Sequence, residues 1–167
     1  MTHSVYPPDS VKPSRQFRSD DSHLKRSAEP MEPAQTPALN VLGTPLECCG
    51  CEPMTGWYRD GFCRTDAADL GRHTVCCQVT ASFLSYSKAQ GNDLSTPMPA
   101  YGFAGLKPGD HWCVCAARWL QAHADGMAPP VILERCEQST LEVVPLSLLR
   151  ANASPGNDAA VPGQEPT

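Results

Sequence analysis

The chain has 167 residues and a formal net charge of −5, with 13 basic and 18 acidic side chains. This acidic balance argues against nucleic-acid binding, because the phosphate backbone is bound by clustered Lys and Arg. No apolar run approaches the roughly 18 residues of a membrane-spanning helix, so a membrane is not an expected partner either. The unusual number is nine cysteines, which points to thiol chemistry or metal binding.

The two ends of the chain differ in composition from the middle. Residues 1–38 and 151–167 are rich in Pro and charged or small residues and contain no Trp or Cys. We expect both to be disordered tails around one domain at 39–150. The first 26 residues lack the apolar stretch of a secretory signal, so we expect a cytoplasmic protein. Thiols stay reduced there, which favours metal ligands, reactive thiols or buried cysteines over a disulfide frame.

Short elements separated by turns are expected in the first half of the domain. Residues 58–62 suggest a short extended piece. The β-branched and apolar run 73–79 predicts a strand. Thr80 is a good N-cap for a helix over 80–89, and Gly91 ends it. Residues 92–99 are a polar loop.

The second half of the domain is expected to continue this mixture. Residues 107–110 contain Pro and Gly in the order of a turn, and 112–116 predict a strand that leads into a helix ending at Gly126. Segments 131–135 and 141–144 suggest an antiparallel hairpin, followed by a short helix at 146–150. The fold class is therefore α+β, a small single domain with long loops.

The most informative cysteine spacing is Cys113-Val114-Cys115. On a strand, both thiols would point to one face, where they could ligate one soft metal such as Zn²⁺. The alternative is that both are buried as small apolar groups. Cys48 and Cys51 form a CxxC, a spacing used in zinc knuckles and redox dithiols, but no second CxxC accompanies it.

Other side chains near these segments are weaker candidates. His73 precedes the cysteines of its strand, and Asp110 and Arg118 flank Cys113 and Cys115. A histidine in such a place is a ligand or a satisfied core residue. Asp110 and Arg118 could belong to a site or form a structural ion pair.

Five segments together resemble one bacterial protein family: NVLGTPLECC, TGWYRDGFC, HTVC, GNDLSTP and GLKPGDHWCVCAARW. This family is the domain of unknown function 2237, and the resemblance covers about residues 40–150. It implies no established activity. The positions that match the family's motifs are Cys49, Cys63, Cys76, Cys113, Cys115, Asp60, His73, Asn92, Asp93, Arg118 and Trp119. The CxxC cysteines fall where the family usually has other residues.

Three functions follow as alternatives. The first is a site for a soft metal, with zinc as the expected cofactor, built from Cys49, Cys63, Cys76, Cys113 and Cys115. The second is a thiol redox enzyme, with one nucleophilic and one resolving cysteine. The third is a protein interaction module whose cysteines are core residues. Six further residues are candidates for the rim of the site: His73, Asn92, Asp93, Thr96, Asp110 and Arg118.

Overall fold

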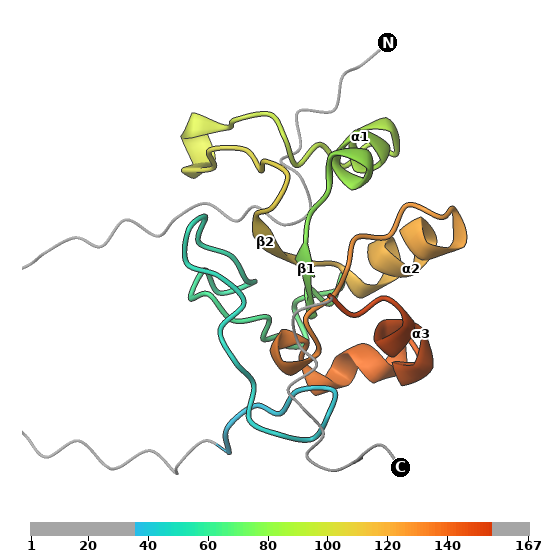
Figure 1. Cartoon of the computed structure of the whole chain (residues 1–167). Coiled ribbons are helices and arrows are strands. Elements are labelled where there is room, and N and C mark those ends of the chain that lie inside the picture. The colour runs from blue at the N-terminus through green and yellow to red at the C-terminus, as the bar shows by residue number, and fades with distance from the viewer. Residues whose placement is uncertain (1–35, 155–167) are drawn as a thin grey trace, which may run out of the picture.

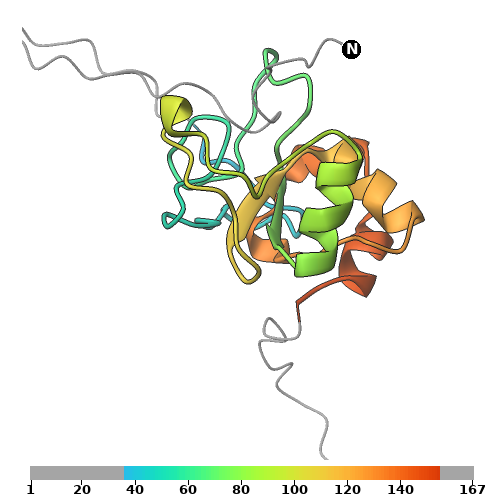
Figure 2. The same cartoon turned by 90° about the horizontal axis from the view of Figure 1, so that it is seen from above.

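The computed structural model describes residues 36–154, so the expected tails lie almost wholly outside the described residues. Two short strands, β1 (Val75–Gln78) and β2 (His111–Val114), pair in antiparallel fashion. The three α-helices are α1 (Ala81–Ala89), α2 (Ala116–Ala124) and α3 (Leu146–Ala151). They lie to one side of the strands. The irregular segment before β1 (residues 48–74) lies on the other side (Figures 1 and 2).

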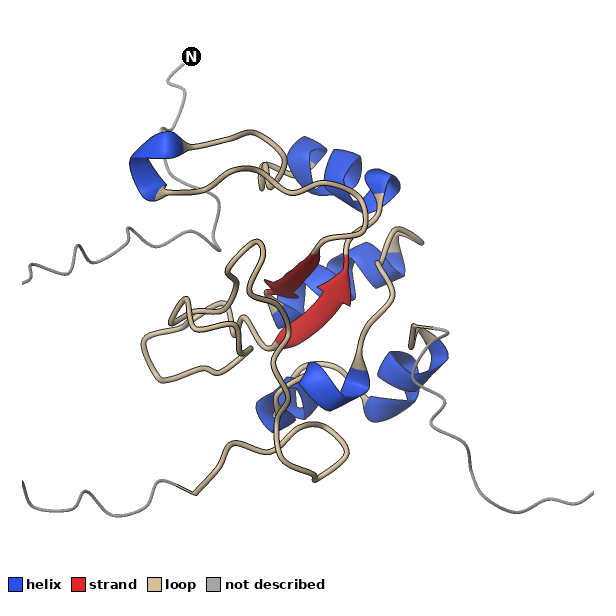
Figure 3. Cartoon of the chain, turned by 60° about the vertical axis from the view of Figure 1, so that its left-hand side comes forward, coloured by secondary structure: helices blue, strands red, loops and turns tan. Residues whose placement is uncertain are grey.

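This mixture of helices and a small antiparallel sheet confirms the predicted α+β class. Loops make up much of the described chain (Figure 3). Three short 3₁₀ helices complete it: η1 (Pro99–Tyr101), η2 (Leu133–Arg135) and η3 (Gln138–Glu142). Within residues 36–154, none of the helices has the length and apolar character that crossing a bilayer requires.

Helix α1 begins where the sequence predicts. The Thr80 hydroxyl accepts a hydrogen bond from the Phe83 amide at 3.1 Å and so caps the first turn. The chain turns at Gly91, whose φ is +89°. Both signals come from residues beside the helix itself, so they set its two ends without any distant contact.

The predicted strand at 112–116 is wrong at its C-terminal end. Strand β2 stops at Val114, and Cys115 is the N-cap of α2. The Ala116 amide donates to the Arg72 carbonyl at 2.9 Å, and this contact holds the start of the helix against the residues before β1. The strand predicted at 73–79 is likewise shorter, at 75–78.

The predicted hairpin between 131–135 and 141–144 is also wrong, because both segments form 3₁₀ helices in part. The chain from Pro130 instead runs along the outer edge of β1. Gln78 N donates to Pro130 O at 3.0 Å, and Ile132 N donates to Cys76 O at 3.0 Å. The backbone groups that a hairpin would use are therefore already paired with β1.

Residues 58–62 form turns rather than the suggested extended piece. Arg59 has a positive φ of 56°, and its amide donates to Gly56 O at 3.1 Å. A residue in this left-handed region reverses the chain. The segment before β1 is therefore folded back on itself, which brings its cysteines close together.

The core lies between the sheet and the helices. Trp112 of β2 and Trp119 of α2 are both fully buried. The Trp119 indole N–H donates to Pro129 O at 3.1 Å, which satisfies the one polar atom of that side chain. A second anchor is the buried Asn40, whose side chain donates to Glu134 O at 3.0 Å and so fastens the start of the domain to η2.

Candidate functional site

Two disulfides join the irregular segment to the two strands. Cys49 is bonded to Cys76 of β1, and Cys63 is bonded to Cys113 of β2. Cys76 and Cys113 lie opposite each other in the strand register, so their side chains are on the same face of the sheet. All four side chains are at most 1% exposed. The two bonds are therefore neighbours in the core.

The expectation that a disulfide frame would be absent is thus wrong. It rested on the expected compartment and not on geometry. The folded segment before β1 brings Cys49 to a Cα–Cα distance of 5.7 Å from Cys76, and Cys63 to 5.3 Å from Cys113. Both distances fall within the usual range for a disulfide.

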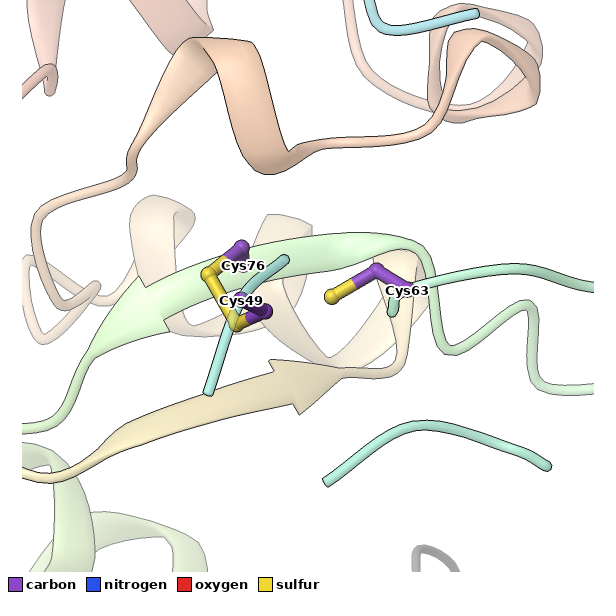
Figure 4. A group of neighbouring side chains, drawn as sticks. All are labelled: Cys49, Cys63 and Cys76. Atoms are coloured by element: carbon purple, nitrogen blue, oxygen red, sulfur yellow. A yellow bond between two sulfur atoms is a disulfide. The ribbon is translucent and has the colours of Figure 1, made fainter. Parts of the chain in front are cut away.

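Three of these sulfurs also have the geometry of a cluster that could hold a metal. The Sγ atoms of Cys49, Cys63 and Cys76 all lie within 4.8 Å of one another, and Figure 4 shows Cys63 beside the Cys49–Cys76 bond. The ligand of a soft metal is a thiolate. Metal binding at this cluster therefore requires that the disulfides be reduced first.

The CxxC forms a separate dithiol at the surface. The Sγ atoms of Cys48 and Cys51 are 3.5 Å apart, and Cys48 Sγ donates to Gly61 O at 3.4 Å. Cys51 is exposed. Desolvation raises the pKa of the Cys48 thiol, and the hydrogen bond and charge of Cys51 raise this pKa further. The Cys48 thiol therefore keeps its proton to a higher pH than an ordinary thiol does.

Cys115 does not join the disulfide cluster. It lies at the N-terminus of α2, is 7% exposed and takes part in neither disulfide. Its Sγ lies 3.3 Å from the position that a Cβ on Gly71 would occupy, and Cε1 of His73 lies 3.0 Å from the same position. Cys115 and His73 therefore border the same small space.

His73 is held by a carboxylate that the sequence analysis did not single out. Asp69 Oδ1 lies 2.6 Å from His73 Nδ1, and Asp69 Oδ2 accepts from the His73 amide at 2.8 Å. Both side chains are at least 95% buried. The Trp57 ring stacks on the imidazole with 5.7 Å between the centroids. The one sequence signal for this pair was the spacing of four residues between Asp69 and His73.

The two remaining cysteines are buried thiols. Desolvation raises the pKa of Cys77 well above its usual value and that of Cys136 to about 12. The Cys136 thiol donates to Ile132 O at 3.2 Å. Neutral buried thiols of this kind are inert, so both are part of the core and not of a reactive site.

The polar loop predicted at 92–99 contains a compact turn built around Asp93. Its Oδ1 accepts from the amides of Ser95 and Thr96, both at 3.0 Å, and its Oδ2 accepts from the Thr96 hydroxyl at 2.6 Å. Partial desolvation raises the pKa of Asp93, but the hydrogen bonds from Thr96 and Ser95 outweigh it and lower this pKa below its usual range. These contacts favour a structural role for the loop.

The other candidate rim residues have local partners. Asn92 is buried and pairs through its backbone with Ser87, at 2.9 Å from its amide and 2.7 Å to its carbonyl. Asp110 Oδ2 accepts from the Lys107 amide at 2.8 Å, which closes the predicted turn. Arg118 donates to Gln90 O at 3.4 Å. Among the candidate rim residues, His73 borders the same small space as the Cys115 thiol.

A cleft near the irregular segment has a volume of about 400 Å³. The hydroxyl of Thr65 at its wall donates to Asp69 Oδ2 at 3.0 Å. The cleft is thereby adjacent to the Asp69–His73 pair. The residues that line it are Ala38, Tyr58, Arg64, Thr65 and Glu137.

The fold and these sites define a small α+β domain with two buried disulfides, a surface dithiol and a further thiol beside a paired histidine. The chain belongs to the family described as "Uncharacterized protein conserved in bacteria (DUF2237)", whose model matches residues 39–153. The family resemblance found in the sequence is thereby confirmed. A comparison with curated proteins gave no match.

Proposed function

We propose that the protein carries out thiol–disulfide exchange through the dithiol of Cys48 and Cys51. The observation that carries this proposal is the 3.5 Å distance between the two Sγ atoms at the surface. Two thiols this close need only a small movement to form a disulfide, and the CxxC spacing is the one used by redox dithiols. Here the pair belongs to an irregular segment and not to the start of a helix.

The roles of the two cysteines follow from their exposure. Cys51 is exposed, whereas Cys48 is half-buried and has a raised pKa. Cys51 therefore attacks a sulfur of a partner disulfide, and the partner's first thiolate leaves with a proton. Cys48 then attacks Cys51 Sγ and releases the second partner thiol. The partner is reduced by two electrons, and Cys48–Cys51 becomes a disulfide.

The buried disulfides have a different role in this proposal. These four cysteines are at most 1% exposed, and exchange needs access of the attacking thiolate to sulfur. We therefore assign Cys49–Cys76 and Cys63–Cys113 to structure, as a frame that fixes the segment carrying the dithiol. Cys49 connects the dithiol to the frame, because it is adjacent to Cys48 in the sequence and bonded to Cys76 of β1.

The experiment is a redox titration of the full chain in glutathione buffers, with trapping of thiols by alkylation and peptide mass analysis. We expect a Cys48–Cys51 disulfide to appear reversibly while the two buried disulfides stay oxidised. A Cys77→Ser variant is the matched control, because it removes an inert thiol. If Cys48 and Cys51 stay reduced, or form only mixed disulfides with glutathione, the proposal is wrong.

A soft-metal site is the second candidate function, and the three sulfurs within 4.8 Å of one another favour it. In this case reduction of both buried disulfides frees Cys49, Cys63, Cys76 and Cys113 as thiolates for zinc. Reduction with a phosphine in the presence of Zn²⁺, followed by metal analysis after gel filtration, tests it. One tightly bound zinc per chain supports this function, and metal at the level of the non-reduced protein contradicts it.

The last part of this proposal concerns the cell compartment and the exchange partner. We propose that the exchange partner is a protein or peptide disulfide in the cytoplasm and that nucleic acid is not a partner, on the grounds of composition and charge. Two disulfides are uncommon in a reducing compartment. Alkylation of thiols in intact cells, before lysis, would report whether Cys49–Cys76 and Cys63–Cys113 are oxidised there.

A further inference from the structure

A cation from a distant part of the chain contacts the segment that carries the surface dithiol. Arg135 belongs to η2 and is half-buried. Its Nη1 donates to the Cys49 carbonyl at 3.5 Å, across 86 residues of sequence. This carbonyl lies inside the CxxC, because Cys49 follows Cys48 and precedes Cys51. The guanidinium is therefore attached to the loop that joins the two thiols.

His111 at the start of β2 completes this contact. Its Nδ1 lies 3.0 Å from the Cys49 carbonyl oxygen and 3.3 Å from Arg135 Nη1. The three atoms form a compact triangle, which fixes the position of the guanidinium against the loop. The Cβ of His111 also lies 3.2 Å from the position that a Cβ on Gly50 would occupy. The loop therefore rests directly on β2, with Arg135 beside it.

The loop has further anchors that do not involve this side chain. Gly61 O accepts from the amides of Cys49 at 2.7 Å and Gly50 at 3.2 Å. The amide of Glu47 donates to Glu134 O at 3.0 Å, which joins the chain before the loop to η2 through backbone atoms alone. The fold of the loop should therefore survive replacement of the Arg135 side chain.

The charge of Arg135 acts on the Cys48 thiol. Desolvation raises the pKa of this thiol, and the hydrogen bond and charge of Cys51 raise it further. A backbone hydrogen bond from Gly50 and the positive charge of Arg135 act in the opposite direction. The attacking species in disulfide exchange is a thiolate, and a nearby cation favours the thiolate over the thiol. Arg135 thus opposes the effects that keep Cys48 protonated.

We propose that Arg135 is a positioning residue of the dithiol, whose guanidinium holds the Cys49 carbonyl and whose charge assists Cys48 in the second step of exchange. This inference rests on the proposed function. In that step Cys48 loses its proton to water and its Sγ bonds to Cys51 Sγ. The bond from Cys51 Sγ to the partner sulfur breaks, and the partner thiolate takes a proton from water. Arg135 itself transfers no proton, because a guanidinium stays charged.

The first test follows Cys48 alone, in the full chain with Cys51→Ser and both disulfides intact. Alkylation by iodoacetamide reports the thiolate fraction, and peptide mass analysis locates the product on Cys48. Arg135→Gln should slow this reaction about 3- to 10-fold at neutral pH, and Arg135→Lys, which keeps the charge, should slow it less. Arg150→Gln is the matched control, because it removes an exposed arginine from the last turn of α3. Equal rates in Arg135→Gln and Arg150→Gln would overturn the proposal.

Salt separates the charge from a purely structural role. About 1 M KCl shortens the range of an exposed charge to about 3 Å, so the difference between the native side chain and Arg135→Gln should shrink. A difference that stays the same at high salt would mean that Arg135 acts through structure and not through its charge. Circular dichroism and urea unfolding should show a native fold in both Arg135 variants.

The second test measures the step itself. Glutathione is joined to Cys51 as a mixed disulfide at low pH, and its release by Cys48 is followed after a jump to neutral pH. Arg135→Gln should slow this release by a similar factor, and an unchanged rate contradicts the assignment. If the native chain forms the Cys48–Cys51 disulfide but Arg135→Gln changes neither rate, this inference alone fails. If the native chain never forms that disulfide, the proposed function fails, whatever the alkylation rates are.

Discussion

The hydroxyl of Thr140 donates to Thr74 Oγ1 at 2.7 Å, and both residues are fully buried. Thr74 Oγ1 in turn donates to the Arg72 carbonyl at 3.3 Å. This same carbonyl accepts from the Ala116 amide. A short chain of hydrogen bonds thus links η3 to the backbone beside His73 and to the start of α2.

Removal of the Thr140 hydroxyl should lower the free energy of unfolding. Thr140→Val keeps the shape of the side chain but removes the hydrogen bond to Thr74 Oγ1, which keeps only its own bond to the Arg72 carbonyl. A hydrogen bond of this kind contributes about 0.5–1.5 kcal/mol net, and we expect a loss of this size in the free energy of unfolding from urea titration. Thr140→Ser, which keeps the hydroxyl, should lose less. Equal losses in the two variants would mean that the methyl group matters and the hydrogen bond does not.

The parts of the fold that depend on local signals could be predicted from the sequence. Helix α1 has its capping Thr80 and its terminating Gly91 within the segment itself. The α+β class followed from the mixture of short patterns. The segment at 131–135 was misassigned because its partner is β1, which is more than fifty residues away in the sequence, and no local pattern reports such a partner.

Four of the five cysteines that the sequence grouped together lie close to one another, but as disulfides and not as the expected thiols. Cys49, Cys63, Cys76 and Cys113 do come together, but as two bonded pairs. Four cysteines allow three pairings that the sequence cannot distinguish. Cys115 was grouped with them because strand alternation was extended past Val114, where β2 in fact ends. One misplaced strand end thus assigned the Cys115 thiol to a cluster to which it does not belong.

Reduction of the buried disulfides should lower stability strongly. They close loops with sequence separations of 27 and 50, and loops of this length correspond to about 3–4 kcal/mol for each bond. Urea unfolding with and without a phosphine reductant measures the difference. The Cys48→Ser/Cys51→Ser variant should show the same loss on reduction. A small difference between the oxidised and reduced protein would contradict a structural role.

Gly61 should be required for the surface dithiol. Its φ is +87°, and a Cβ there would lie 2.9 Å from Cys48 Sγ and 3.2 Å from Cys51 Sγ. Gly61→Ala should cost about 1–2 kcal/mol from the backbone conformation and should also slow formation of the Cys48–Cys51 disulfide. Gly91→Ala is the control, because it has a similar φ of +89° and no neighbour within 4 Å. Equal exchange rates in the two variants would exclude a contact effect.

The turn around Asp93 should contribute stability that depends on pH. Because hydrogen bonds lower the pKa of Asp93 in the folded state, its contribution is complete above the unfolded pKa of about 4 and is lost as the pH falls through the lower, folded pKa. Asp93→Ala should cost about 1 kcal/mol at neutral pH. Asp93→Asn should retain part of the turn but show a flatter stability profile below pH of about 4.

The order of the bonded cysteines has a topological consequence. Along the chain the first is joined to the third and the second to the fourth, so the two loops overlap. Any single cut of the backbone between Cys49 and Cys113 therefore leaves the two pieces covalently linked by at least one bond. A protease that nicks the exposed turns of this region would change the number of chain ends without releasing a fragment, and only a reductant would separate the halves.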